Sequence, residues 1–459
     1  ISKLYNRLHL KPSSYAYQLF LFKNSLNPDD PPDVYVMIVA WYGVSPSSNQ
    51  ALFALEKLAV LLQEEYPEAF VILTELTYVD DIMGGADTLE EREKQITQVE
   101  KVLASGGFSL KYILRSGDSS DNTSVKILGY RWNMKDDTIG HGFTELNFNK
   151  KKRGLKSSNP FPVTKPDDVT KLLLSSDITR RTVISKIAEL WDPVGFWEPY
   201  KFQLKCAGQT LNGLDWDIPL SQEYQEYWTD RFKEFLSIPN LSLERYIFPL
   251  DVSTSDGIRL LCISDAAGTA GGAAIYAGVK LPNGKYSCKL LTSKSKLMSE
   301  SVPRNELEGI RIASSLAYDV KSALGDLVKE VHFFTDSSIA MSWCHNDKKK
   351  LRLFVFNRVC EIRRQIGSVT DTELPLYHID GKVNPADLLT KPNNLKPEDM
   401  HSSSVWTSGY PWMELDFNDM PITTYSDLQL NASQSQCMIQ ECFPEILLPS
   451  QINHINQVV

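Results

Sequence analysis

The sequence predicts an α+β protein built from several domains. At a typical size of roughly 150 residues per domain, its 459 residues suggest about three domains. With 42% hydrophobic and 23% charged residues, the composition is that of a folded globular protein and not of a disordered chain. Strand-like and helix-like patterns alternate along the chain, and from residue 259 onward three short strands precede a helix.

The first 132 residues are expected to alternate strands and helices. Continuous apolar runs predict the strands. Thr88 and Glu91 form a capping-box pattern that opens a helix, and Gly106 ends it. The expected strands are 33–41, 70–79, 108–114 and 125–132, and the expected helices are 49–65 and 88–105.

The rest of the chain changes character twice. Residues 134–170 are polar and carry the basic cluster 150–156 among prolines, which indicates an exposed connection, and a mostly helical segment follows to about residue 240. The regular pattern fades beyond Pro392, and residues 425–459 are expected to be poorly ordered. In between, strands are expected at 259–265, 271–279, 285–293, 331–335 and 375–379, and helices from Pro303, at 337–346, at 352–366 and from Pro385.

The charge balance argues against binding nucleic acid by overall positive charge, although a local basic groove remains compatible with it. The chain has 48 Lys and Arg against 57 Asp and Glu, a net charge of -9 and a pI near 5.4. Seven scattered cysteines without a C-x-x-C pair are typical of free thiols in a reducing compartment and indicate no zinc site. The longest apolar run, residues 34–44, is too short to cross a bilayer, so we expect no membrane partner.

Two adjacent carboxylates, Asp80 and Asp81, lie between an apolar strand and a second short apolar piece. This places them at the tip of an expected hairpin. Adjacent like charges repel, so the arrangement is favourable where divalent cations and phosphates neutralise it. An ordinary solvated Asp-Asp turn is the alternative.

A second set of acids is spread over the later elements. Asp265 and Asp336 each follow an apolar strand, where an unpaired charge is costly. On the helix between them, Glu306 lies near the centre of the apolar stripe and requires a cation, whereas Glu308 is expected to face outward. Asp387 opens the last helix, where its alternative role is a first-turn acid favoured by the helix dipole.

The segment Tyr78-Val79-Asp80-Asp81 resembles the catalytic motif of reverse transcriptases. Gly43–Ser48 is similar to that family's loop against template and incoming nucleotide, and Gly107–Tyr112 and Leu128–Trp132 are similar to its later palm and primer-grip strands. The resemblance implies catalytic, metal-binding roles for Asp80 and Asp81 and nucleotide or nucleic-acid contacts for Tyr5, Gly43 and Lys111.

The reverse transcriptase pattern also includes a third aspartate on the first palm strand. Ile1–Tyr5 fits that pattern from its second position, so the aspartate is expected immediately before Ile1. Two-metal phosphoryl transfer needs carboxylates from both strands. We therefore expect this chain to polymerise weakly or not at all.

Within that family, the closest likeness is to the Pol polyproteins of BEL/Pao-type LTR retrotransposons. Thr179–Ser185, Trp191–Phe196 and Asp215–Asp217 are similar to the linking region of that group. The resemblance implies four parts: an N-terminally truncated reverse transcriptase palm at 1–140, a thumb or connection region at 141–250, a ribonuclease H-like mixed-sheet domain at 255–395, and a linker or tail at 396–459 toward a missing integrase region.

The order of elements and acids after residue 259 resembles the ribonuclease H fold. The resemblance implies that Asp265, Glu306, Asp336 and Asp387 together bind two Mg²⁺ or Mn²⁺ ions, as Asp80 and Asp81 would in the polymerase site. It also matches His378 with a loop histidine involved in product release, for which an ordinary surface histidine is the alternative.

Basic residues surround one helix of the second domain. They could line a groove for an RNA/DNA hybrid, or they could form a solvated face. These residues are Lys348, Lys349, Lys350 and Arg352, with Arg358, Arg363 and Arg364 further along.

We therefore expect a fragment of a retrotransposon Pol polyprotein that acts as RNA-directed DNA polymerase and ribonuclease H. Its expected partners are an RNA template, a DNA primer, RNA/DNA hybrids, dNTPs, and the protease and integrase domains of Pol, in a cytoplasmic virus-like particle or in the nucleus. The alternatives are an inactive nucleic-acid-binding remnant and a Pao-type aspartic peptidase. The peptidase is the weakest, because Asp118-Ser119-Ser120 and Asp336-Ser337-Ser338 both lack the glycine of Asp-Thr/Ser-Gly.

Overall fold

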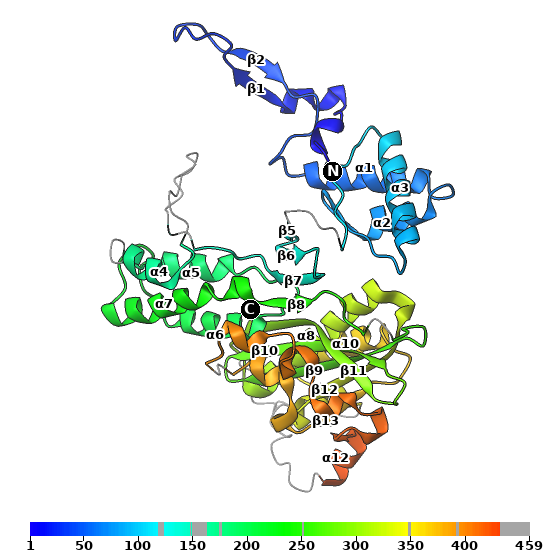
Figure 1. Ribbon diagram of the computed structural model, residues 1–459. Coiled ribbons are helices and arrows are strands. Elements are labelled where there is room, and N and C mark those ends of the chain that lie inside the picture. Colours follow the sequence, from blue (N-terminus) through cyan, green and yellow to red (C-terminus); the bar gives the residue numbers. More distant parts are fainter. Residues whose placement is uncertain are drawn as a thin grey trace, which may run out of the picture. The chain divides into compact units, whose positions relative to one another are not determined.

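The computed structural model describes residues 1–117, 124–146, 148, 163–173, 177–249, 252–347, 350–391 and 394–431 (Figure 1). The chain divides into two compact units, Ile1–Asp118 and Ser119–Val459. Each unit is mixed α/β, which confirms the predicted class at this level. The domain boundaries 1–140, 141–250, 255–395 and 396–459 remain predictions.

The first unit is built around three helices that share one core. The helices are α1 (Ser47–Leu61), α2 (Pro67–Glu75) and α3 (Leu89–Ser105), and their core includes Leu55, Leu73 and Leu103. Its short elements are the 3₁₀ turns η1 (Tyr5–Arg7) and η2 (Pro12–Tyr17), the hairpin β1 (Leu19–Phe22) with β2 (Asp33–Val36), and the hairpin β3 (Thr77–Tyr78) with β4 (Asp81–Ile82).

The helices α1 and α3 confirm the sequence predictions for this unit. The Thr88 hydroxyl accepts from Glu91 N at 3.2 Å, and Glu91 Oε2 accepts from Thr88 N at 3.2 Å, which is the predicted capping box. The predicted strand at 70–79 is wrong, because most of this run forms α2. A continuous apolar run fits a buried strand and a buried helix equally, and here Pro67 at the first turn and packing against α1 and α3 favour the helix.

Two other strand predictions in this unit also change. The predicted strand at 33–41 is limited to β2, whose side chains are exposed, and an isolated bridge between His9 and Val39 follows it. The predicted strand at 108–114 is wrong, because these residues are in no strand. Phe108 packs instead as a buried side chain against the helical core.

The second unit opens with a small antiparallel sheet and a helical layer. The sheet has the order β5 (Ser124–Ile127), β6 (Tyr130–Asn133), β7 (Thr138–His141) and β8 (Ser242–Glu244). The expected single strand 125–132 is therefore a hairpin, because Leu128 and Gly129 both adopt positive φ and turn the chain. The predicted helical segment is confirmed as α4 (Pro166–Leu173), α5 (Arg180–Glu189), α6 (Glu198–Gln209) and α7 (Gln222–Phe235), followed by η3 (Ile238–Asn240). The basic cluster 150–156 lies outside the described residues.

A six-stranded sheet forms the centre of the second unit. Its order is β11-β10-β9-β12-β13-β14, in which β9, β12 and β13 run parallel to one another and the other pairs are antiparallel. The three-strand, helix, strand, helix, helix, strand pattern is confirmed by β9 (Ile258–Ala267), β10 (Ala270–Lys280), β11 (Tyr286–Leu297), α8 (Val302–Leu324), β12 (Val328–Thr335), α9 (Ser338–Cys344), α10 (Leu353–Gly367) and β13 (Leu376–Ile379), with η4 (Gly325–Leu327) before β12.

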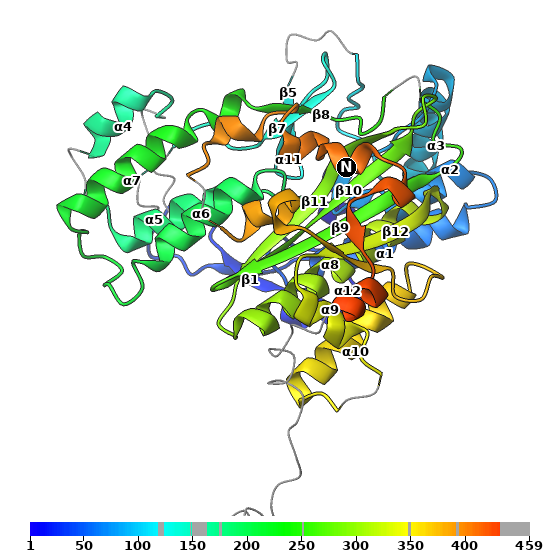
Figure 2. The same ribbon diagram turned by 90° about the horizontal axis from the view of Figure 1, so that it is seen from below.

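The central sheet buries both of its faces. On β9, Leu260 and Cys262 pack against α8, α9 and α10, whereas the alternating Leu261 and Ile263 face the opposite core. Figure 2 shows these helices on one side of the sheet and α11 on the other. Strands that are covered on both faces read as continuous apolar runs, as the sequence of β9 does.

The second face is covered by residues 396–420 of a C-terminal strap, residues 396–431, whose end joins the sheet edge and then packs beside α9 on the first face. Within it Trp406 and Trp412 are buried against the sheet, and their indole nitrogens donate to Phe196 O at 2.9 Å and to Val383 O at 3.1 Å. The strap contains η7 (Pro397–Met400), α11 (Val405–Ser408), η8 (Pro411–Glu414), η9 (Phe417–Asp419), β14 (Ile422–Thr423) and α12 (Tyr425–Asn431).

The strap changes the prediction for the C-terminus. The expectation of poor order from residue 425 is wrong for 425–431, which form α12, and residues 432–459 lie outside the described part. Among the described residues, no helix is both long and apolar enough to cross a membrane.

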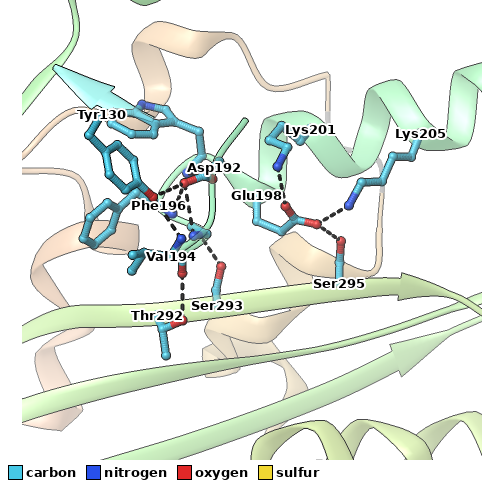
Figure 3. A network of polar contacts seen from close by, with 12 residues as sticks. Tyr130, Asp192, Val194, Phe196, Glu198, Lys201, Lys205, Thr292, Ser293 and Ser295 are labelled. Carbon is cyan, nitrogen blue, oxygen red and sulfur yellow. Dashed lines mark hydrogen bonds and ion pairs between the residues drawn. The ribbon is translucent and has the colours of Figure 1, made fainter. Parts of the chain in front are cut away.

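The segment Trp191–Phe196 forms a polar joint between the two sheets of the second unit (Figure 3). Asp192 is buried and accepts from the backbone N–H groups of Gly195, Phe196 and Trp197 at 2.8–3.1 Å. The Tyr130 hydroxyl of β6 donates to Asp192 at 2.8 Å, and Ser293 N of β11 donates to the carbonyl of Val194 at 2.9 Å.

Candidate metal centre

Three of the predicted carboxylates meet at one end of the central sheet. One oxygen from each of Asp265, Glu306 and Asp336 lies within 4.8 Å of the others. Asp265 lies near the end of β9, Asp336 directly follows β12, and Glu306 is in the second turn of α8.

Strand pairing explains why the two aspartates are neighbours. Strands β9 and β12 are parallel, and Ser264 pairs with Thr335, so the next residue of each strand is the aspartate. Helix α8 approaches this end closely because it carries Gly309, where a Cβ would lie only 3.0 Å from the Asp265 carbonyl oxygen. The close approach brings Glu306 to the aspartates.

The electrostatics of the three acids favour a bound cation. Burial, with added repulsion from Asp265 and Asp336, raises the pKa of Glu306 to about 9. Burial, together with the charges of Asp336 and Asp387, raises the pKa of Asp265 to about 7, although a hydrogen bond from Thr390 opposes the shift. Burial also raises the pKa of Asp336. A positive ion at this point would relieve the repulsion and favour the charged forms.

The unpaired oxygens of this group fit a hard divalent ion. Glu306 Oε2 and Asp336 Oδ1 are buried, and neither has a hydrogen-bond partner among the described residues. Carboxylate oxygens without nitrogen or sulfur donors are the ligand set that Mg²⁺ and Mn²⁺ prefer. The three residues can therefore hold a metal ion, as the sequence predicted.

Asp387 and His378 lie at the edge of this group. Asp387 is in η6 (Pro385–Leu389), a short 3₁₀ turn where an α-helix was expected, and its carboxylate pairs with Lys391 at 2.8 Å. His378 is in β13, within the strand predicted at 375–379 and not in the loop that the resemblance implies, because its backbone pairs with Thr335 of β12. His378 Nε2 donates to the Asp336 carbonyl at 3.0 Å, so it contacts the backbone of a proposed ligand.

Three polar residues of the site were not predicted from the sequence. Asn384 is buried and donates from Nδ2 to the Ser264 carbonyl at 3.1 Å. The Thr390 hydroxyl donates to the carboxylate of Asp265, and Lys391 pairs with Asp387. The partners of Asn384 and Thr390 on β9 are more than a hundred residues away, so only their position near Asp387 could have indicated them. The spacing of four residues between Asp387 and Lys391 was a local signal.

The prediction that Glu308 faces outward is wrong. Glu308 is buried, because Arg311 of its own helix and Arg358 of α10 both pair with it. Arg358 pairs with Glu308 across the α8–α10 contact and Arg363 pairs with Asp347 at 2.8 Å, and the groove for an RNA/DNA hybrid stays a prediction. Lys350 and Arg352 are exposed beside α10, and Lys348 and Lys349 lie outside the described residues.

Asp80 and Asp81 lie in the first unit, at the tight turn between β3 and β4. Both are exposed, and Val79 before them adopts φ 56°, a left-handed conformation that is unusual for valine. Partial burial and the charge of Asp80 raise the pKa of Asp81. The Ile1 amino group donates to the Asp80 carbonyl at 2.7 Å, so the first residue lies beside this turn.

The other predicted contact residues of the first unit are separated into two places. The Tyr5 hydroxyl is 3.0 Å from Ser48 Oγ, and its ring contacts Tyr42 edge to face at 4.8 Å. Gly43 adopts φ 81° in the turn before α1 and directly follows Tyr42, whose ring contacts Tyr5. Lys111 extends over the ring of Tyr112 at 5.7 Å, and no contact among the described residues joins it to the Asp80 turn.

The peptidase alternative gains no support from the described residues. Asp336 belongs to the carboxylate group, and Ser337 caps α9 by accepting from Ala340 N at 3.2 Å. Residues 118–120 lie outside the described part.

Comparison with known proteins gives a match to one family model and similarity to solved structures. The chain matches no curated protein. A structure described as the foamy viral protease-reverse transcriptase in complex with dsDNA is similar at a TM-score of 0.45 and 15% identity, covering 81% of this chain and 65% of that chain. Residues 179–337 match the family described as Pao retrotransposon-like RNaseH-like domain. That range contains Asp265, Glu306 and Asp336, so this part of the chain is similar to the Pao retrotransposon group that the sequence resembles.

Proposed function

We propose that the second unit cleaves the RNA strand of RNA/DNA hybrids as the ribonuclease H part of a retrotransposon Pol polyprotein. The observation that carries the proposal is the meeting of Asp265, Glu306 and Asp336 at the ends of two parallel strands, within the segment that matches an RNaseH-like family. Asp387 completes the set as a fourth acid on the neighbouring 3₁₀ turn.

The four acids would hold divalent ions, Mg²⁺ or Mn²⁺, two per site. When bound, the ions would activate a water and stabilise the leaving 3′-oxygen of the cut RNA strand. The protein's part is to hold the carboxylates in place before binding. Asp265 and Asp336 are held by adjacent strand ends, and Glu306 is held by a helix packed on the same sheet.

His378 would orient the site through the backbone. Its ring donates to the carbonyl of Asp336, and its strand pairs with β12 on one side and with β14 on the other. Lys350 and Arg352 are exposed at the start of α10, where they could contact the phosphates of a hybrid.

Cleavage of a labelled RNA/DNA hybrid in Mg²⁺ tests this proposal. We expect wild-type protein to cut only the RNA strand and EDTA to stop it. Asp336→Asn and Glu306→Gln should lower the rate at least about a hundredfold, because each removes a charged ligand. Asp319→Asn, an exposed acid on the same helix as Glu306, is the matched control and should cut normally. Full activity in both site variants would remove the proposed assignment, and a folded wild type that binds hybrid without cutting it would support the inactive remnant.

A polymerase function of the first unit is the second candidate. It is favoured by two adjacent carboxylates on the β3–β4 turn, with the first residue beside Asp80 and with Tyr5 next to the loop before α1. Primer extension with dNTPs on an RNA template tests it, and Asp80→Asn with Asp81→Asn is the control for a contaminating polymerase. Extension that persists in the double variant would exclude this turn as the polymerase site.

A further inference from the structure

We propose that Lys391 is an exchangeable counter-cation of the metal centre. In the metal-free protein its ammonium would neutralise Asp387, and binding of a divalent ion would release it. This inference rests on the proposed metal-binding function, and it assigns a regulatory role to a residue outside the four acids.

The contact itself is direct. Lys391 Nζ lies 2.8 Å from Asp387 Oδ1, across one turn of the chain, and Lys391 N donates to the Asp387 carbonyl at 3.0 Å. The Lys391 side chain is 48% exposed and that of Asp387 29%, so the ammonium can leave into solvent without unfolding its surroundings.

The segment that carries Lys391 is attached to the metal ligands. Thr390, the preceding residue, donates to the carboxylate of Asp265, and Asn384 donates to the carbonyl of Ser264 on the same strand. These two anchors hold the segment against the end of β9. Lys391 therefore stays close to the acids even when its ion pair opens.

The charge of Lys391 acts on the whole group of acids. Its ammonium lowers the pKa of Asp265, Glu306 and Asp336 against the larger effect of burial. In return, although burial lowers it, the pKa of Lys391 is raised overall by the hydrogen bond to Asp387 and by the neighbouring carboxylates, so the side chain stays charged.

A divalent ion and this ammonium compete for the same carboxylates. An oxygen of Asp387 that accepts from Lys391 is not available as a ligand in that direction, and two positive charges near each other repel. Removing the ammonium should therefore tighten binding of the ion. A purely structural role would have the opposite sign, because the loss of Lys391 would then leave Asp387 without its support and weaken binding.

Direct titration with Mn²⁺ separates these two roles. We expect Lys391→Met to bind the ion about fivefold more tightly than wild type by calorimetry, and Lys391→Arg, which keeps the charge, to bind like wild type. Lys382→Met, an exposed lysine whose ammonium has no acidic partner among the described contacts, is the matched control. Circular dichroism establishes that each variant is folded, and Lys391→Gln provides the same test if the methionine variant is not.

The outcomes distinguish this inference from the proposed function. Wild-type binding with equal or weaker binding in Lys391→Met would overturn the counter-cation role and leave the metal centre intact. If folded wild-type protein binds no Mn²⁺, the proposed metal centre and the counter-cation role of Lys391 are both wrong.

Discussion

The Thr390 hydroxyl donates a hydrogen bond to the carboxylate of Asp265, a residue 125 positions earlier in the chain. Both side chains are buried, and the contact joins the short turn that carries Asp387 to the strand that carries the first acid of the metal centre. It leaves Asp265 with one fixed orientation before any ion arrives. Thr390 is thus a positioning residue of the proposed nuclease.

Replacing Thr390 by valine should lower metal affinity and hybrid cleavage without unfolding the protein. Valine keeps the volume but removes the donor, and a hydrogen bond to a charged group contributes about 1.5–3 kcal/mol. We expect roughly a tenfold weaker Mn²⁺ affinity for Thr390→Val, measured by calorimetry. Thr390→Ser keeps the hydroxyl and should restore it, and equal binding by all three proteins would rule out the positioning role.

The metal-free protein should lose stability as the pH rises from about 5 to 9. In the folded state the pKa of Asp265 is raised to about 7 and that of Glu306 to about 9, so the folded state binds more protons than the unfolded one in this range. The stability they contribute is complete below their ordinary values of 3.8 and 4.5 and is lost as the pH passes the folded values. The loss should amount to a few kcal/mol, measured by urea unfolding in EDTA.

Two comparisons check that this pH dependence comes from the acids of the metal centre. Glu306→Gln cannot ionise and should flatten the upper part of the profile. Added Mg²⁺ should stabilise the protein most at high pH, where the ligands are charged. If the dependence of stability on pH is the same in wild type and Glu306→Gln, it comes from other titratable groups.

The joint around Asp192 should contribute strongly to the stability of the second unit. Removing its carboxylate would leave several buried backbone donors and the Tyr130 hydroxyl without their acceptor. We expect Asp192→Ala to cost about 3 kcal/mol or more, and Tyr130→Phe about 1 kcal/mol, by urea unfolding. Asp256→Asn changes an exposed acid of the same unit and should leave the free energy of unfolding almost unchanged. An Asp192→Ala protein as stable as this control would show that the joint does not stabilise the unit.

The C-terminal strap should loosen when Arg259 is replaced. This buried arginine of β9 donates to the Leu415 carbonyl at 2.8 Å and to that of Met413, and its guanidinium lies over the ring of Tyr286. Arg259→Met keeps a long apolar side chain but removes the guanidinium donors to both carbonyls and leaves Met413 O with only the weak thiol donor of Cys288. We expect faster hydrogen exchange in residues 411–420 and unchanged exchange in α8. If exchange in the strap does not change, its buried tryptophans are sufficient to keep it on the sheet.

The sequence was most informative where local patterns are unambiguous. The capping box at Thr88 and the order of strands and helices from residue 259 to 379 were predicted correctly, because caps and apolar periodicity depend on neighbouring residues. The run that became α2 was misread, because an unbroken apolar run has no periodicity to separate a helix from a strand. Packing against α1 and α3 favours the helix over the strand.

The residues of the metal centre also separate into those that local patterns identified and those that only distant contacts explain. Asp265, Asp336 and Glu306 could be identified from the sequence, since each places a charge at the end of an apolar strand or on an apolar helix face. Glu308 was misread, because its partner Arg358 is on another helix, 50 residues away. Thr390 was missed for the same reason, because its partner Asp265 is 125 residues away, whereas Lys391 pairs with Asp387 only four residues away and the local sequence contains that contact.

By itself, the sequence determined which side chains would carry a charge into an apolar environment, because that conflict is visible in the order of residues. Only the tertiary structure decided that these charges meet. The parallel pairing of β9 with β12, in the register that sets Ser264 beside Thr335, places Asp265 next to Asp336 across 70 residues of chain. That register results from packing on both faces of the sheet, by the helices on one side and the strap on the other, which is a property of the whole unit and not of any segment in it.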